Sequence, residues 1–243
     1  MITRNYKIAG KVVEISSLLN DVHDYCADYL TDEPADYSVV TSMDDIVFER
    51  EKSAHENELE GRPVHYYPDG YLEELAVYRK IADKMLDYDT ILFHGSVIAV
   101  DGQGYLFTAK SGTGKSTHTS LWMKYFGDKA VMVNDDKPLL AVTEEGVTAY
   151  GTPYNGKHRR GANISVPLKA ICILTRAENN SIAPVLPIQV YPLLIQQVNR
   201  PADPLKMQKT LELVDRLSEK TKLYKLGCNM DISAAVTAYE GMR

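Results

Sequence analysis

The sequence predicts an α/β protein built on a central sheet, and three stretches of the chain support this prediction. Residues 105–108 are strand-like and lead through a loop of small residues into a helix that begins at Lys115. Residues 170–175 form a continuous apolar run, which is typical of a strand in a sheet covered on both faces. From Thr90 onward, strand-like and helix-like stretches follow one another.

Length and charge predict two parts with different surfaces. At 243 residues, 44% of them hydrophobic and 25% charged, the chain fits a large domain with a substantial appendage. We predict a small α+β unit over residues 1–89 and a larger α/β domain over 90–243. Residues 1–90 carry 20 acidic and 9 basic side chains, whereas residues 91–243 carry 13 and 18. The positive part suits a polyanionic ligand. The acidic part either forms a solvated surface or attracts a basic partner or peptide.

Composition also excludes several classes of protein. Cys26, Cys172 and Cys228 are isolated and odd in number, so neither a disulfide framework nor a zinc knuckle is indicated. Because the chain has no dense Lys/Arg stripe with interleaved aromatic residues, we expect no nucleic-acid partner. It shows no apolar signal region and no run of membrane-spanning length, so we expect no membrane partner and a cytoplasmic location. Whether the chain forms a homo-oligomer is left open by the sequence.

Patterning predicts the individual elements. In the first part we expect a strand over 6–15, a helix over 17–30 capped by Ser17, strands over 37–41 and 45–51, a charged loop over 52–62 and a helix over 70–86. In the second part we expect strands over 91–93, 97–100, 105–108, 131–133, 139–142, 147–150, 170–175 and 222–226, the fifth and sixth forming a hairpin. Helices are expected over 115–126, 188–198, 206–220 and from 232 onward, the last capped by Asp231.

The loop before Lys115 has the composition of a phosphate-binding loop. Its backbone N–H groups and the helix N-terminus that follows form a cradle for phosphates, although Ala109 stands where the usual pattern has its first Gly. Lys115 is placed to reach the outer phosphates, and the Ser116 hydroxyl to ligate Mg²⁺. The alternative is a Gly/Ser turn before an ordinary helix. We expect a nucleoside triphosphate to bind through Ser111, Gly112, Thr113, Gly114, Lys115, Ser116 and Thr117.

Two carboxylates follow the next apolar strand. Asp135 and Asp136 leave the strand at 131–133, where an acidic residue can hold Mg²⁺ opposite the loop hydroxyl. A pair of carboxylates allows one to serve the metal and the other to accept a proton from an alcohol nucleophile. An Asn-Asp-Asp turn without a catalytic role is the alternative.

Basic side chains gather in the Gly/Pro/Asn-rich stretch 150–161. Lys157, Arg159 and Arg160 are interpreted as clamps on the substrate or the transferring phosphoryl group, because phosphoryl transfer depends mostly on positioning and charge stabilisation. The alternative is that these charges only keep a surface loop soluble.

The combined motifs resemble a known family. His94-Gly95, the Ser-Gly-Thr-Gly-Lys-Ser loop and Asp135-Asp136 together are similar to the catalytic domain of HPr kinase/phosphorylase, which belongs to the phosphoenolpyruvate carboxykinase-like group of P-loop folds. The loop and the strand over 169–175 look even more like phosphoenolpyruvate carboxykinase itself. The resemblance covers roughly residues 90–176, and it implies a P-loop sheet of this type.

The resemblance implies a role for each site residue. Asp135, or alternatively Asp136, looks like the base that takes the proton from a seryl-type hydroxyl, with His94 as its phosphate-facing helper. Lys115 is implied to bind the β- and γ-phosphates. Ser116 and the other aspartate, Asp136 in the first assignment, are implied to hold Mg²⁺. ATP and Mg²⁺ are therefore the expected cofactors.

The sequence also departs from the family. Residues 150–157 contain no carboxylate where HPr kinase has a metal-binding Glu, and the protein-docking signature of that enzyme is not recognisable. Relatives in the wider group phosphorylate free serine or the serine of a small peptide. We therefore expect a kinase that transfers the γ-phosphoryl group to a hydroxyl of a small molecule or peptide. The alternatives are a non-catalytic nucleotide sensor and a carboxykinase-like lyase. The acceptor, the donor (ATP, ADP or pyrophosphate) and reversibility stay open.

Overall fold

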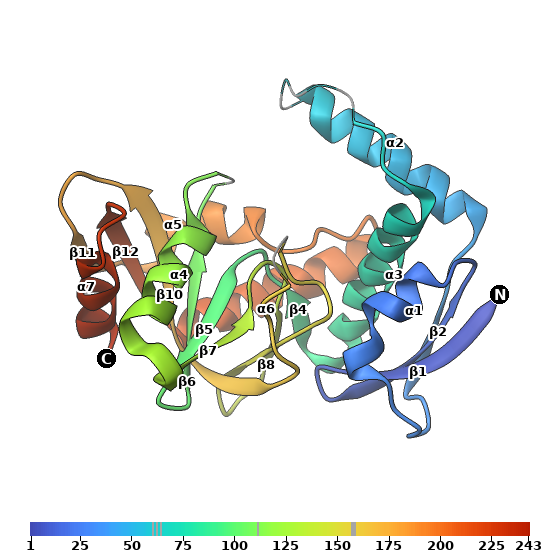
Figure 1. The fold of residues 1–243 in the computed structure, drawn as a ribbon, viewed down its shortest axis with the longest axis horizontal. Helices are drawn as coiled ribbons and strands as arrows, with labels where there is room; N and C mark the ends of the chain where they lie inside the picture. Colours follow the sequence, from blue (N-terminus) through green and yellow to red (C-terminus); the bar gives the residue numbers. More distant parts are fainter. Residues whose placement is uncertain (60, 62, 64, 111, 157–158) are drawn as a thin grey trace. The chain divides into compact units, whose positions relative to one another are not determined.

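The computed structural model describes residues 1–243 except 60, 62, 64, 111, 157 and 158. The chain divides into two compact units, Met1–Lys84 and Met85–Arg243. Both units contain helices and strands, so the described chain is a mixed α/β protein as predicted (Figure 1). In the part of the chain that the structure describes, no helix combines the length and the apolar character needed to span a membrane.

The first unit combines a small sheet with helices. Its strands lie in the order β1-β2-β3, with β1 antiparallel and β3 parallel to β2. The elements are β1 (Ile2–Ile8), β2 (Lys11–Ser17), α1 (Asp21–Tyr25), a 3₁₀ turn (Ala27–Tyr29), β3 (Tyr37–Val40), α2 (Met43–Leu59) and α3 (Asp69–Met85). The strand predicted over 37–41 and the helix predicted over 70–86 are confirmed.

The start of the chain corrects two predictions. In place of one strand over 6–15, β1 and β2 form a hairpin that turns at Ala9 and Gly10. The helix predicted over 17–30 is wrong, because only α1 and the 3₁₀ turn form there. Ser17 ends β2 and caps no helix. Its hydroxyl donates to the Leu19 carbonyl oxygen and hydrogen-bonds the buried His23 ring.

The α2 helix corrects a third prediction. The strand over 45–51 and the loop over 52–62 are wrong, since one helix covers Met43–Leu59. The Ser42 N–H donates to the Asp45 carboxylate, and this bond is half of a capping box at the helix start. The Ser42 hydroxyl donates to the same carboxylate. Arg79 of α3 also donates to Glu49. These polar contacts stabilise a helix that has little hydrophobic periodicity to reveal it in the sequence.

The second unit is built on one curled sheet. Among the described residues it has nine strands, in the order β4-β8-β9-β10-β6-β5-β7, with β12 added to β10 and β11 to β12. The strands are β4 (Thr90–Leu92), β5 (Ser96–Val100), β6 (Gln103–Thr108), β7 (Ala130–Asn134), β8 (Leu139–Val142), β9 (Val147–Tyr150), β10 (Ser165–Arg176), β11 (Ser181–Pro184) and β12 (Lys222–Cys228). The predicted strands of this unit are present, and β11 is an addition to them.

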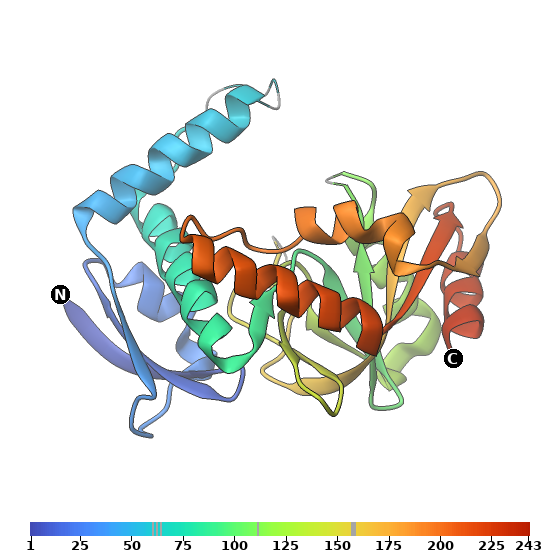
Figure 2. The same ribbon diagram turned by 180° about the vertical axis from the view of Figure 1, so that it is seen from behind.

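Helices cover both faces of this sheet. They are α4 (Lys115–Phe126), α5 (Pro187–Gln196), α6 (Pro204–Lys220) and α7 (Ser233–Met242), which confirms the four predicted helices. Trp122 of α4 and Ala238 of α7 belong to one buried cluster, and Leu194 of α5 and Leu213 of α6 to the other. Figure 2 shows α5 and α6 on the face opposite to α4 and α7. Alternate β10 residues enter the two clusters, so the strand predicted to be covered on both faces is confirmed.

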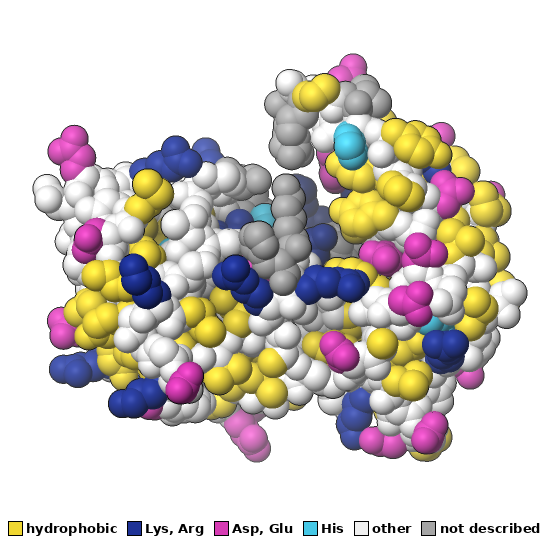
Figure 3. Space-filling view, in the orientation of Figure 1, with side chains coloured by type: hydrophobic (Ala, Val, Ile, Leu, Met, Phe, Trp, Pro, Cys, Tyr) yellow, Lys and Arg dark blue, Asp and Glu magenta, His cyan; other side chains and the backbone are white. Residues whose placement is uncertain are grey.

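Surface charge differs between the units. On the face drawn in Figure 3, Asp and Glu side chains are frequent over the first unit, whereas Lys and Arg side chains are prominent over the second. This distribution agrees with the acidic excess before residue 91 and the basic excess after it.

Candidate functional site

Strand register brings three predicted segments to one edge of the second unit's sheet. Thr108, the last residue of β6, pairs with Ile173 of β10. Asn134, the last residue of β7, pairs with Val97 near the start of β5, and the start of β5 pairs with the end of β6. The loop after β6, the turn after β7 and the segment before β5 therefore leave the sheet at the same edge.

Two glycines in the loop between β6 and α4 allow the chain to turn sharply into the helix. Gly112 and Gly114 have φ values of 75° and 119°, which side chains with a Cβ rarely allow. The Thr113 N–H and hydroxyl donate to the Lys110 carbonyl oxygen at 3.2 and 2.8 Å. The His118 N–H donates to the carbonyl oxygen of Gly114, the residue that precedes α4. This arrangement leaves the first N–H groups of α4 at the end of a glycine-containing loop, where anions are favoured.

The first turn of α4 carries three predicted residues. Ser116 and Thr117 are exposed, and Lys115 is half-buried. Burial lowers the pKa of Lys115, while the charges of Asp136 and Asp135 act in the opposite direction. Lys115 is therefore within electrostatic reach of both carboxylates.

Asn134, which sequence reasoning did not select, fixes the turn that carries the two carboxylates. Its side-chain oxygen accepts hydrogen bonds from the N–H groups of Asp136 and Lys137 at 2.9 and 2.7 Å. Its amide nitrogen donates to the Thr152 hydroxyl at 3.0 Å. Asn commonly bonds the backbone two residues ahead, so the Asn-Asp-Asp sequence contained this signal.

Asp135 is buried among polar groups. The Ser96 hydroxyl lies 3.0 Å from its carbonyl oxygen and 3.2 Å from its Oδ1. Burial raises the pKa of Asp135, and the Asp136 charge adds to that effect. The hydroxyls of Ser96 and Ser116 and the charge of Arg160 oppose it. The Ser116 hydroxyl therefore lies on the Asp135 side of the carboxylate pair.

Asp136 is paired with His94. The distance from His94 Nε2 to Asp136 Oδ1 is 3.4 Å, and Lys137 Nζ lies 3.9 Å from the other carboxylate oxygen. Burial by itself would raise the pKa of Asp136. The hydrogen bond with His94 and the charges of Lys137, His94 and Lys115 outweigh burial and hold this pKa below its usual value.

The backbone around His94 is held from three directions. Its N–H donates to the Gln197 carbonyl oxygen at 2.6 Å, and its own carbonyl accepts from the Thr108 hydroxyl at 3.1 Å. The Gly95 N–H donates to the Asp136 carbonyl oxygen at 2.9 Å. His94 is therefore tied both to the end of β6 and to the carboxylate turn.

Gly151, at the start of the basic stretch, packs closely against the end of β7 and against Ala162. A Cβ on Gly151 would collide with the backbone oxygens of Ala162 and Val133, so only Gly allows this close approach. Arg160 donates to the Ser120 hydroxyl of α4 at 3.4 Å, and its charge acts on Asp135. Arg160 is thus brought near Asp135, and its role as a clamp stays a prediction.

The other predicted residues of these two loops are Arg159, Ser111 and Lys157. Arg159 is exposed beside Arg160. Ser111, predicted to bind nucleotide, and Lys157, predicted to bind substrate, lie outside the described residues.

Arg176 is a second residue that sequence reasoning missed. It ends β10, and its guanidinium donates to the Gly112 carbonyl oxygen at 2.7 Å. The contact joins the end of β10 to the loop before α4. No short motif surrounds this arginine, so only the fold reveals its position.

The donor set fits a magnesium ion that arrives with phosphates. Among the described residues, no group of three or more His, Cys, Asp or Glu side chains is placed to hold a metal ion. Mg²⁺ usually takes one or two carboxylates, with phosphate oxygens and waters completing its shell. Ser116 beside Asp135 supplies a hydroxyl and a carboxylate of that kind.

Comparison with known proteins places the chain in a family. The family model described as SynChlorMet cassette protein ScmC matches residues 72–230, which is more than half of the chain. The chain belongs to the ScmC family. The matched range contains every residue of the site described above, so the site lies inside the part that defines membership. Among curated proteins, none matches this ScmC-family chain.

A solved structure with limited likeness is the Hpr(Ser) kinase/phosphatase from Coxiella burnetii. It is 15% identical to this chain, with a TM-score of 0.29, over 53% of this chain and 97% of that one. A likeness of this size defines neither the fold nor the chemistry of the ScmC-family chain.

Proposed function

We propose that this ScmC-family chain is a Mg-ATP-dependent kinase that transfers the γ-phosphoryl group to a hydroxyl of a serine-like small molecule or a peptide. The observation that carries the proposal is the meeting, at one sheet edge, of Lys115 with two carboxylates in different surroundings. The motif resemblance to HPr kinase/phosphorylase supports the same reaction class.

The contacts favour one of the two assignments that the sequence left open. Ser116 and the buried Asp135 lie together, so we assign them to Mg²⁺. Asp136 is paired with His94 and is half-buried, whereas Asp135 is buried, so an incoming hydroxyl reaches Asp136 more readily. We therefore assign Asp136, oriented by His94, as the proton acceptor.

These residues account for each part of a phosphoryl transfer. The acceptor hydroxyl gives its proton to Asp136, and its oxygen bonds to the γ-phosphorus. The bond from that phosphorus to the β,γ-bridging oxygen breaks, and ADP leaves with the electron pair. Lys115 stabilises the charge on the phosphates, and Arg160 faces the same region from the basic loop. Bound Mg²⁺ would neutralise phosphate charge.

The test is steady-state kinetics with Mg-ATP over a panel of alcohols: free serine, polyols and short peptides that contain serine. The proposal expects ADP formation that depends on one acceptor and produces a phosphomonoester. If ATP binds but no alcohol in the panel is phosphorylated, and Asp136→Asn leaves background ATP hydrolysis unchanged, the kinase proposal fails. A non-catalytic nucleotide sensor would then take its place.

A further inference from the structure

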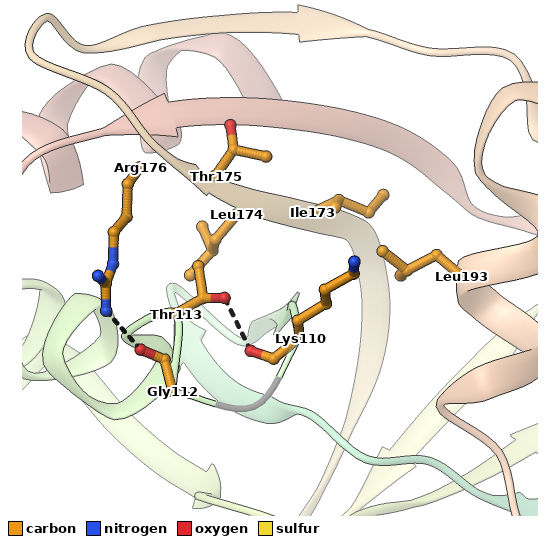
Figure 4. Close-up of a pocket in the computed structure, with 8 residues that line it drawn as sticks. All are labelled: Lys110, Gly112, Thr113, Ile173, Leu174, Thr175, Arg176 and Leu193. Atoms are coloured by element: carbon orange, nitrogen blue, oxygen red, sulfur yellow. Dashed lines mark hydrogen bonds between the residues drawn. The ribbon is translucent and has the colours of Figure 1, made fainter. Parts of the chain in front are cut away.

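A cavity of about 510 Å³ lies beside the loop before α4. Figure 4 shows that its walls come from this loop, from the last residues of β10 and from Leu193 of α5. This volume is within the range of pockets that bind small molecules.

The cavity is lined by both apolar and cationic side chains. Ile173 belongs to the buried cluster on the α5 and α6 face of the sheet, and Leu193 packs against that cluster from α5. Leu174 belongs to the cluster on the other face. Lys110 and Arg176 line the cavity nearer the loop, with Arg176 bonded to the Gly112 carbonyl oxygen. An apolar surface next to positive charge suits a ligand that has a flat apolar body and an attached anionic group.

The sheet order puts this cavity and the carboxylates on opposite sides of β6. β10, which lines the cavity, pairs with β6 on one side. On the other side of β6 lie β5 and then β7. Asp135 and Asp136 come after β7. A ligand that lies across the loop therefore has one end at the cavity and the other at Lys115 and the carboxylates.

We propose that the cavity holds the nucleoside of the bound nucleotide, with the base against Ile173 and Leu193. This inference rests on the proposed kinase function and adds the direction in which ATP lies. The positive charges of Lys110 and Arg176 favour an anionic ligand beside the loop. The acceptor does not use this cavity, because it must approach the γ-phosphate from the carboxylate side of β6.

The experiment compares Mg-ATP with Mg-tripolyphosphate, which has the phosphates without the nucleoside. Titration calorimetry gives both dissociation constants for the wild type, Leu193→Ala and Leu193→Trp. Ile188→Ala is the matched control, since Ile188 lies on the same helix and is 80% exposed. Thermal melts without ligand establish that each variant is folded.

The proposal expects ATP to bind the wild type more tightly than tripolyphosphate. Leu193→Ala, which removes apolar contact, and Leu193→Trp, which fills the cavity, should each weaken ATP binding by about tenfold or more. Both should leave tripolyphosphate binding unchanged, and Ile188→Ala should change neither constant.

Two results would overturn the nucleoside site while leaving the phosphate site intact. One is equal affinity of the wild type for ATP and tripolyphosphate, a comparison that needs no variant to fold. The other is an ATP affinity that the Leu193 variants leave unchanged, or lower by the same factor as tripolyphosphate affinity. If the wild type binds neither compound, the proposed kinase function fails as well.

Discussion

The two units surround their buried polar side chains with different kinds of groups. In the first unit, the fully buried Glu73 accepts hydrogen bonds from the N–H groups of Leu18 and Leu19 at 2.7 and 2.9 Å and from the Thr41 hydroxyl at 2.5 Å. In the second unit, Asp135 is nearly as buried but stands beside other ionisable groups at a sheet edge.

The difference separates structural polar groups from groups that are ready for a ligand. The Glu73 carboxylate is engaged by the chain's own donors, so its bonds hold the first unit together. At the sheet edge of the second unit, a lysine, two carboxylates and a histidine lie close together, and the pKa values of the lysine and of both carboxylates are shifted. Such clusters of perturbed groups are typical of functional sites.

The largest effect that would test this contrast is expected for Asp136→Asn. The amide keeps the size of the side chain but is a poor proton acceptor, so turnover should fall by about 10²–10⁴-fold. Steady-state kinetics with the best acceptor measures the change, with Mg-ATP affinity measured in parallel. Asp215→Asn is the control, because Asp215 is an exposed carboxylate on α6. A variant at Asp136 with wild-type turnover would remove this residue from the chemistry.

A smaller loss of turnover, of about 10²-fold, is expected for Asn134→Ala. The substitution removes the acceptor that fixes the Asp136 N–H, and displacement of reacting groups by about 1 Å has an effect of this size. The fold should survive well enough for thermal melts to show a single transition. If the folded variant keeps its full turnover, the turn does not need Asn134 to position the carboxylates.

Glu73→Gln should lower the free energy of unfolding and leave turnover unchanged. The amide has one acceptor oxygen where the carboxylate has two, so a buried N–H loses its partner, and the free energy of unfolding should fall by about 1–3 kcal/mol. Denaturant unfolding measures this change, and kinetics below the unfolding transition should match the wild type. A loss of turnover in fully folded Glu73→Gln would break the contrast between the units.

The last prediction concerns the pH dependence of stability at His118. Burial lowers the pKa of His118 to about 4, so the unfolded chain binds a proton there more readily than the folded one between pH 6.5 and 4. Stability should therefore fall as pH drops through this window, by about 1 kcal/mol per pH unit at most.

His118→Gln offers the corresponding control. The amide oxygen can still accept from the Trp122 ring N–H, which lies 3.1 Å from His118 Nε2 in the wild type. Denaturant unfolding at pH 7.5, 6.0 and 5.0 should show a shallower decline for this variant. Equal slopes in the two proteins would exclude His118 as the source of the pH dependence.

The sequence predicts the second unit better than the first. Local signals there are strong: β6, the glycine loop and α4 follow one another without interruption, and Gly127 ends the helix where expected. In the first unit α2 has weak amphipathic periodicity, and its polar contacts with α3 involve residues distant in sequence, such as Arg79 with Glu49. Tertiary contacts of that kind leave no local pattern to read.

Within the site, motif residues could be predicted but their partners could not. The sequence selects Lys115, Asp135, Asp136 and His94 as candidates, and the structure brings them to one edge. The sequence alone does not reveal that His94 pairs with Asp136, because both carboxylates occupy equivalent places in the motif. Arg176 and the cavity beside it depend on β10 lying next to β6, which is a property of sheet order.

The central claim is that the loop before α4 binds Mg-ATP through Lys115, and calorimetric titration of Lys115→Ala tests it most directly. Lys124→Ala is the matched control, since Lys124 is an exposed lysine on the last turn of the same helix. We predict measurable Mg-ATP binding by the wild type and by Lys124→Ala, and a loss of affinity of about 10²-fold or more for a folded Lys115→Ala, the size of effect found when a preorganised phosphate or oxyanion partner is removed. Equal Mg-ATP affinity in all three proteins would contradict the account.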